Sequence, residues 1–220
     1  MGGYYTVQPG DTLYSIAFRY GLNFRNMARA NGIDRNYRIY PGQRLRLSEV
    51  SASSTARNVS RPRSSVTAAA PASASAKPQK PPAERAADQR QRAVANTSIS
   101  WRWPASGRIL RNFQSRGQIN KGIDIDGSRG DPVFAAASGR VVYAGSGLLG
   151  YGNLIIINHN EQFLSAYAHN NRLLVKENQR VKTGQKIAEI GNSGATRTML
   201  HFEIRKDGKP VNPLHYLPKR

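Results

Sequence analysis

The sequence predicts a multidomain protein. Residues 4–50 read as a small α+β unit in the order strand, helix, helix, strand, residues 51–100 as a disordered basic linker, and residues 101–220 as an all-β domain. The middle segment has no aromatic residue, Leu or Met, so it buries too little apolar surface to offset the entropy of ordering. The flanking segments alternate apolar runs with Gly, Pro and Asn turns, as folded domains do.

Composition narrows the class of partner. The chain has 33 Lys and Arg against 13 Asp and Glu, a net charge of +20, and no cysteine. A disulfide framework and a thiolate metal site are therefore excluded for these 220 residues. The positive charge is spread over all three segments, which favours general affinity for polyanionic surfaces over a nucleic-acid reader. No run approaches the roughly 20 apolar residues that a transmembrane helix needs.

The first segment has clear boundaries for each element. Residues 5–7 have strand propensity, and Asp11 after the Pro-Gly turn is placed to cap a helix that Gly21 can end. A second helix is predicted from Asn23. Residues 43–47 alternate apolar and polar side chains, which predicts a half-buried strand.

This segment resembles a LysM domain. The resemblance is carried by Tyr-Thr-Val-x-x-Gly-Asp-Thr-Leu-x-x-Ile-Ala at residues 5–17, Asn-Gly at 31–32 and Pro-Gly-Gln-x-Leu at 41–45. It implies binding of glycans that contain N-acetylglucosamine, in a shallow groove between two loops. The implied glycan-binding residues are Gly10, Asp11, Thr12, Leu13, Ile39 and Tyr40. The alternative is that Gly10, Asp11 and Thr12 form only a turn and a helix cap.

The third segment is a series of short β-rich runs. They cover residues 108–110, 132–134, 140–143, 154–157, 163–167, 185–190 and 201–205. Gly or Asn separates most of them, and Asp207-Gly208 suits a tight hairpin. No convincing amphipathic helix of three turns lies among them.

Three motifs in this segment resemble the signature of the lysostaphin-type (LytM) zinc metallopeptidases. That signature is His-x-x-x-Asp, then Tyr-Ala-His, then His-x-His. Asp124, His169 and His201 match it, whereas Asn120 and Met199 stand where the first histidines of the first and last motifs belong. The resemblance implies that zinc would be held by positions 120, 124 and 201.

The two departures predict a site without metal or catalysis. A catalytic zinc needs three protein ligands and an open position for water. The amide of Asn120 replaces imidazole poorly on zinc, and the thioether of Met199 cannot move a proton. We therefore expect no catalytic residue, no bound metal and no cofactor. We expect Asp124, His169 and His201 to persist as a hydrogen-bonded polar cluster.

The order of the three segments resembles the NlpD-like murein hydrolase activators. This resemblance implies a non-catalytic activator of a zinc-dependent N-acetylmuramoyl-L-alanine amidase, recruited to peptidoglycan by the LysM domain during septal or envelope remodelling. It further implies a periplasmic lipoprotein anchored in the outer membrane, with the anchor cysteine upstream of Met1.

Two other functions remain open from the sequence. One is a zinc endopeptidase with an unusual ligand set that cleaves peptidoglycan cross-links, and the other is a passive wall-binding scaffold. For an activator we expect a partner-binding anchor in the glycine-rich loop 145–152, where Leu148, Leu149 and Tyr151 could form an exposed apolar surface. The alternative is that this loop only joins two strands, with its leucines turned inward.

Overall fold

The computed structural model describes residues 3–48, 99–117 and 119–220. Met1–Val50 and Ser98–Arg220 fall into one compact unit. We refer to residues 3–48 as the N-terminal domain and to residues 99–220 as the β domain. The predicted linker lies almost wholly outside the described residues. Within those residues, no helix has the length and apolar character to cross a membrane.

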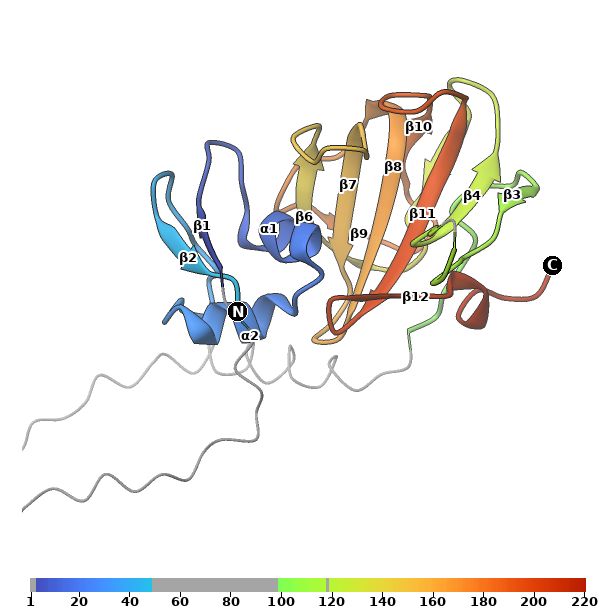
Figure 1. Ribbon diagram of the computed structural model, residues 1–220. Coiled ribbons are helices and arrows are strands. Elements are labelled where there is room, and N and C mark those ends of the chain that lie inside the picture. Colours follow the sequence, from blue (N-terminus) through green and yellow to red (C-terminus); the bar gives the residue numbers. More distant parts are fainter. Residues whose placement is uncertain (1–2, 49–98, 118) are drawn as a thin grey trace, which may run out of the picture. The chain divides into compact units, whose positions relative to one another are not determined.

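The N-terminal domain has the predicted order of two strands around two helices (Figure 1). Strand β1 (Tyr4–Thr6) pairs antiparallel with β2 (Arg44–Arg46), and helices α1 (Leu13–Tyr20) and α2 (Phe24–Ala30) lie between them in sequence. Apolar side chains from all four elements and their loops meet in one core. Its buried members are Val7, Leu13, Ile16, Ala17, Phe24, Met27, Ala28 and Leu45.

The cap of α1 differs from the prediction. Thr12 is the N-cap, because its hydroxyl accepts the backbone N–H of Ser15 while the Ser15 hydroxyl accepts that of Thr12, both at 3.0 Å. Asp11 instead accepts the backbone N–H of Gln8 at 2.9 Å and the hydroxyl of Tyr5 at 2.7 Å. The prediction that Asp11 caps the helix is therefore wrong by one residue, because two donors from the preceding turn and strand hold its carboxylate.

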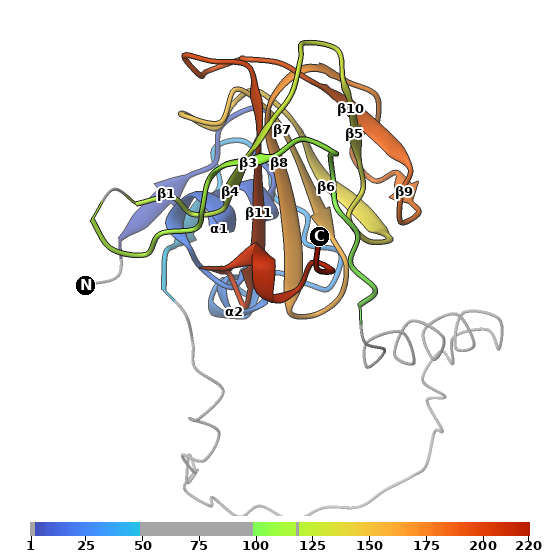
Figure 2. The same ribbon diagram turned by 90° about the vertical axis from the view of Figure 1, so that its right-hand side faces the viewer.

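The β domain is built on one large sheet (Figure 1). The strand order is β3-β4-β11-β8-β7-β6-β9, with β12 also paired to β11, and β10 paired to both β8 and β5. The strands are β3 (Ile109–Arg111), β4 (Ile123–Asp126), β5 (Pro132–Phe134), β6 (Gly139–Gly145), β7 (Asn153–Asn158), β8 (Phe163–Leu173), β9 (Arg180–Val181), β10 (Lys186–Ile190), β11 (Met199–Lys206) and β12 (Lys209–Val211). Strands β5 and β10 lie side by side (Figure 2). A short 3₁₀ helix (Pro213–His215) follows β12.

Each of the seven predicted β-rich runs overlaps a strand, although residues 108 and 185 lie just outside β3 and β10, and the structure adds three strands that the sequence analysis missed: β4, β9 and β12. Asp207 and Gly208 form the predicted hairpin turn between β11 and β12, both with positive φ, at 50° and 81°. That pair of angles is typical of a two-residue type I′ turn.

A close approach fixes where β4 meets β11. A Cβ atom on Gly122 would lie 2.1 Å from the carbonyl oxygen of Phe202. Any other residue at this position would push the two strands apart. Gly122 thus allows β4 to begin in contact with β11, and this pairing aligns the candidate site.

The core of the β domain lies beneath the sheet and contains a buried polar cluster around Tyr167. The Tyr167 hydroxyl accepts the backbone N–H of Ala136 at 2.8 Å and the hydroxyl of Ser165 at 2.9 Å. The Ser165 hydroxyl also lies 2.7 Å from Nε2 of His159. The Tyr167 ring is fully buried. Its hydrogen bond with Ala136 connects β8 to the segment that follows β5.

We expect Tyr167→Phe to lower the free energy of unfolding of the β domain by about 1–3 kcal/mol, because the buried Ala136 N–H and the Ser165 hydroxyl lose a partner. Both tryptophans, Trp101 and Trp103, lie in the β domain, so urea unfolding followed by their fluorescence reports on this domain. Tyr20→Phe is the control, since Tyr20 is an exposed side chain of α1. Equal unfolding midpoints for the two variants would contradict the prediction.

Candidate functional site

Strand register places the retained motif residues next to one another. His201 of β11 pairs with Asp124 of β4 on one side and with Ala168 of β8 on the other. His169 follows Ala168 directly in β8. Nδ1 of His201 lies 2.6 Å from Oδ1 of Asp124, so the expected polar cluster is present for these two residues.

A second carboxylate contacts the same imidazole. Nε2 of His201 lies 3.2 Å from Oε1 of Glu203, and the Tyr151 hydroxyl donates to that oxygen at 2.8 Å. The other oxygen of Glu203 accepts a hydrogen bond from Nε of Arg205 at 2.7 Å. His201, Glu203 and Arg205 alternate along β11, so they share one face of the sheet; we call this the site face.

These contacts set the charge state of the cluster. Burial opposes a charged imidazole at His201, but the hydrogen bonds and charges of Asp124 and Glu203 outweigh it and raise its pKa to about 9. Burial likewise opposes ionisation of Glu203, but the charge of Arg205 and the contacts with His201 lower its pKa to about 2. At neutral pH the cluster therefore holds a protonated imidazole between two carboxylates.

His169 lies beside this cluster but is bonded elsewhere. Its ring centroid is 6.0 Å from that of His201, and its Nδ1 lies 2.8 Å from the carbonyl oxygen of Ser193. Burial lowers the pKa of His169, and the Ser193 carbonyl offsets this only in part. The φ of His169 is 65°, a left-handed conformation that is uncommon for a residue other than glycine.

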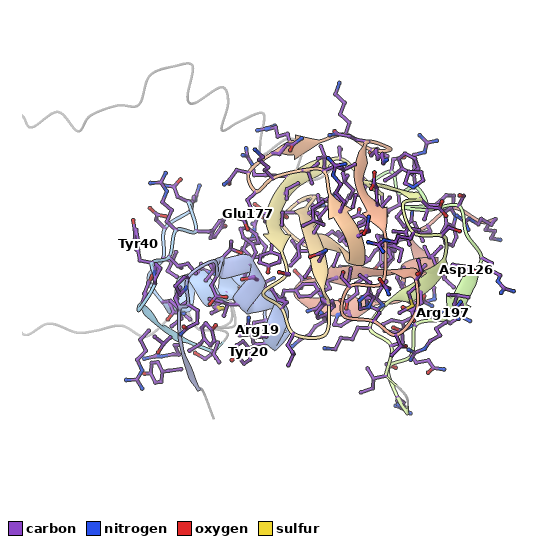
Figure 3. The ribbon with its side chains drawn as sticks, turned by 90° about the horizontal axis from the view of Figure 1, so that it is seen from above. Arg19, Tyr20, Tyr40, Asp126, Glu177 and Arg197 are labelled. Carbon is purple, nitrogen blue, oxygen red and sulfur yellow. The ribbon has the colours of Figure 1, made fainter. Side chains whose placement is uncertain are left out.

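The two departures from the motif occupy ordered positions. Asn120 is largely buried and donates its side-chain N–H to the carbonyl of Asn112 at 3.1 Å. Met199 pairs with Asp126 and shares the site face with His201. Asp126 lies at the surface, where Arg197 approaches it at 3.4 Å (Figure 3).

The donor set does not fit a catalytic zinc. A catalytic zinc needs three protein ligands, and of the three motif positions only Asp124 and His201 carry strong zinc donors; these two hydrogen-bond to each other, with Nδ1 and Oδ1 2.6 Å apart. Position 120 supplies an amide that is engaged with a backbone carbonyl. In the part of the chain that the structure describes, no three His, Asp or Glu side chains form a group that could hold a metal.

Positive charge at the cluster comes from side chains of the protein. Besides protonated His201, Nη1 of Arg111 lies 3.7 Å from the second oxygen of Asp124, and Arg205 pairs with Glu203. The two carboxylates are therefore balanced by imidazolium and guanidinium groups.

Sequence analysis missed Glu203, Arg205 and Arg111. The available signal was in β11, where polar residues 201, 203 and 205 alternate with the apolar residues Leu200, Phe202 and Ile204.

The loop proposed as a partner-binding anchor is only partly exposed. Leu148 is 2% exposed and packs in an apolar cluster, whereas Leu149 is 99% exposed. Tyr151 is half-buried and bonded to Glu203. The expectation of three exposed side chains is thus corrected to one, Leu149, because the loop turns Leu148 and Tyr151 onto the sheet.

The two loops predicted to bind glycan lie next to each other. Gly42 donates its N–H to the Val7 carbonyl at 2.8 Å, and Val7 donates to Gln43 at 2.9 Å, which joins the bases of the two loops. Tyr40 is 66% exposed, whereas the Leu13 side chain is fully buried in the core. Leu13 can therefore offer a ligand only its backbone. Gly10 is exposed, and Asp11, Thr12 and Ile39 are partly exposed.

Comparison with known protein families matches both domains. The LysM domain model matches residues 5–48, and the model of peptidase family M23 matches residues 118–213. Among solved structures, a zinc-containing peptidase from Vibrio cholerae aligns with a TM-score of 0.50 and 30% identity, over 52% of this chain and 39% of that one.

Curated relatives match over nearly the whole chain. The lipoprotein NlpD/LppB homolog of Pseudomonas aeruginosa is 49% identical over 99% of this chain and 78% of its own length. The murein hydrolase activator NlpD of Escherichia coli is 40% identical over 100% of this chain and 69% of its own. The outer membrane antigenic lipoprotein B of Haemophilus influenzae is 38% identical over 99% of this chain and 64% of its own.

The raised pKa of His201 makes the stability of the β domain depend on pH. Because the folded state binds the imidazole proton more tightly than the unfolded state, the contribution is complete below about pH 6.5 and is lost as pH rises through about 9. We expect the free energy of unfolding to fall by on the order of 1 kcal/mol or more between pH 6.5 and 9.5. The free energy of unfolding at each pH is measured by urea unfolding followed by tryptophan fluorescence.

His201→Gln should lose this alkaline dependence, whereas His159→Gln should keep it. Titration of the His201 imidazole near its ordinary pKa in an NMR experiment would contradict the assignment.

Proposed function

The chain belongs to the NlpD family of lipoproteins and murein hydrolase activators, and we propose that it activates a peptidoglycan amidase without cutting the wall itself. The chemistry of the candidate site carries this proposal. A family M23 fold is retained, but position 120 supplies the amide of Asn120, a poor zinc ligand, and its side-chain N–H is engaged with the Asn112 carbonyl. Such a domain can present a surface, but it lacks the ligands to activate a water molecule.

The proposed partners are peptidoglycan and a zinc-dependent N-acetylmuramoyl-L-alanine amidase. The N-terminal domain, which matches the LysM family, would hold the protein on the glycan strands. The β domain would then act on the amidase where that enzyme meets its substrate, in septal or envelope remodelling. The net charge of +20 supports retention near the anionic wall. Nucleic acid has no part in this proposal.

The proposed location is the periplasm. Relatives that match almost the whole chain are named as lipoproteins, one of them as an outer membrane lipoprotein. An outer-membrane lipid anchor is part of the proposal and would leave both domains facing the peptidoglycan layer.

Leu149 is the proposed contact for the amidase. Its side chain is almost completely exposed, while its neighbour Leu148 and the nearby Tyr151 fix the loop to the sheet. A large apolar side chain held out from an anchored loop can enter a partner's pocket with little loss of conformational entropy, which is the usual property of an interface anchor.

We expect Leu149→Ala to weaken amidase activation about tenfold, equivalent to about 1.4 kcal/mol of binding free energy. The measurement is dye release from labelled sacculi by a purified amidase, with the activator titrated. Leu174→Ala is the matched control, because Leu174 is a partly exposed leucine at 37% on another part of the β domain. Circular dichroism verifies that both variants fold.

The same assay tests the proposed function as a whole. Dye release is expected only when amidase and this protein are both present. Peptide cleavage by the purified chain, together with about one tightly bound zinc per chain, would identify an endopeptidase instead. Wall binding without any amidase activation would identify a passive scaffold.

We expect Tyr40→Ala to weaken sedimentation with purified peptidoglycan by about fivefold, because Tyr40 is an exposed aromatic side chain beside the proposed glycan loops. Tyr20→Ala is the control, since Tyr20 is an exposed tyrosine on α1 (Figure 3). Added salt should spare the Tyr40-dependent binding while screening the contribution of net charge. Equal losses in the two variants would place the glycan site elsewhere.

A further inference from the structure

The site face continues beyond the polar row as an apolar surface. In β8, Leu164, Ala166 and Ala168 pair with the three polar residues of β11 and point to the same side. Neighbouring strands and the following loop extend this surface. The buried residues of the β domain in this cluster are Val142, Tyr143, Leu148, Leu154, Ile156, Leu164, Ala166 and Ala168. It is separate from the main core of the β domain.

Helix α1 of the N-terminal domain covers this apolar surface. Phe18 is 2% exposed and is a member of the cluster on the site face. It is absent from the buried core of its own domain, so its burial depends on the β domain. Tyr14, one turn earlier in α1, packs against both clusters.

Arg205 holds Phe18 in two ways. Its guanidinium carbon lies 3.4 Å from the centroid of the Phe18 ring, and its Nη1 donates to the Phe18 carbonyl at 2.6 Å. Tyr151 meets the same ring edge-on, with centroids 5.4 Å apart. Arg205 is 2% exposed. A buried guanidinium needs its donors satisfied, and here a backbone carbonyl of α1 satisfies one of them.

Further polar contacts between the two domains lie around the contact of Phe18 with Arg205. Lys209 donates to the Gly21 carbonyl at 2.8 Å, and Arg25 pairs with Glu161 at 2.7 Å. Arg205 and Lys209 thus bind carbonyls at the C-terminal end of α1, where unpaired carbonyls and the helix dipole favour cations.

The turn between β11 and β12 fits closely against the same helix end. A Cβ atom on Gly208 would lie 2.3 Å from the Leu22 carbonyl oxygen, and the φ of Gly208 is 81°. Glycine is therefore required here twice, for the turn and for the contact with the N-terminal domain.

We propose that the N-terminal domain docks through α1 onto the site face, and that this closed form competes with an amidase that reaches from the exposed Leu149 onto the apolar surface beside it. Docking buries the apolar half of the surface that also carries His201. Contacts run without a gap from Phe18 through Arg205 and Glu203 to His201. The competition rests on the proposed function; the docking does not.

Docking is tested with a zero-length cross-link. In an Arg25→Lys variant of the whole chain, carbodiimide should join the new amine to the Glu161 carboxylate, because the native pair is in direct contact. Mass spectrometry of the digested protein identifies the linked peptides. Glu161→Gln in the same background removes the acceptor. Adding Phe18→Ala should lower the yield of this link at least about fivefold, because the variant removes the central contact and leaves the core of the N-terminal domain intact.

A link to Glu161 that depends on Phe18 supports docking. Linkage to Glu177 and Glu189 with the same yield as to Glu161, or a yield unaffected by Phe18→Ala, would overturn it.

Competition is tested in the sacculus assay. With limiting activator, Phe18→Ala alone should raise dye release by the amidase at least about threefold, and the cross-linked Arg25→Lys protein should activate less than its unlinked form. Unchanged or reduced activation by Phe18→Ala, in a protein whose cross-link yield has fallen, would overturn the competition. Failure of the unaltered chain to activate the amidase would instead reject the proposed function and leave the cross-linking result to decide docking.

Discussion

The antiparallel register of β4, β11 and β8 is the constraint on which the rest of the site depends. It sets His201 opposite Asp124 on one side and Ala168 on the other, and it places Glu203 and Arg205 on the same face. A shift of one residue in β11 would move all three polar side chains into the core and expose their apolar neighbours. The apolar core below the sheet therefore fixes the position of the polar cluster above it.

The cluster shows how the retained residues of a metallopeptidase motif can be linked by ion pairs within the chain. Two carboxylates close together need a nearby cation. Protonated His201 and the guanidinium groups of Arg111 and Arg205 supply positive charge from within the chain. The polar residues thus remain useful to the fold as a network of ion pairs, even where the motif has lost two of its histidines.

Much of the architecture could be predicted from the sequence, since turns and apolar alternation are local. The sequence analysis identified both domains and the motif positions. It did not identify Glu203 or Arg205 as members of the cluster, because their role depends on which strands pair with β11, and pairing is not local. The exposure of Leu148 was wrong for the same reason: a glycine-rich loop is consistent with either orientation of its leucines, and the apolar surface that buries Leu148 is assembled from distant strands.

The central position of β11 has a consequence for folding. This strand lies near the end of the chain, at Met199–Lys206, yet it stands between β4 and β8 in the sheet. The β domain therefore cannot complete its sheet until β11 has been synthesised and has paired with β4 and β8. Contacts between residues so far apart in sequence also slow folding. Until β11 has paired, β4 and β8 each present an unpaired edge, the feature through which β proteins aggregate. The N-terminal domain, whose own apolar core is formed by residues within 3–48, can fold first.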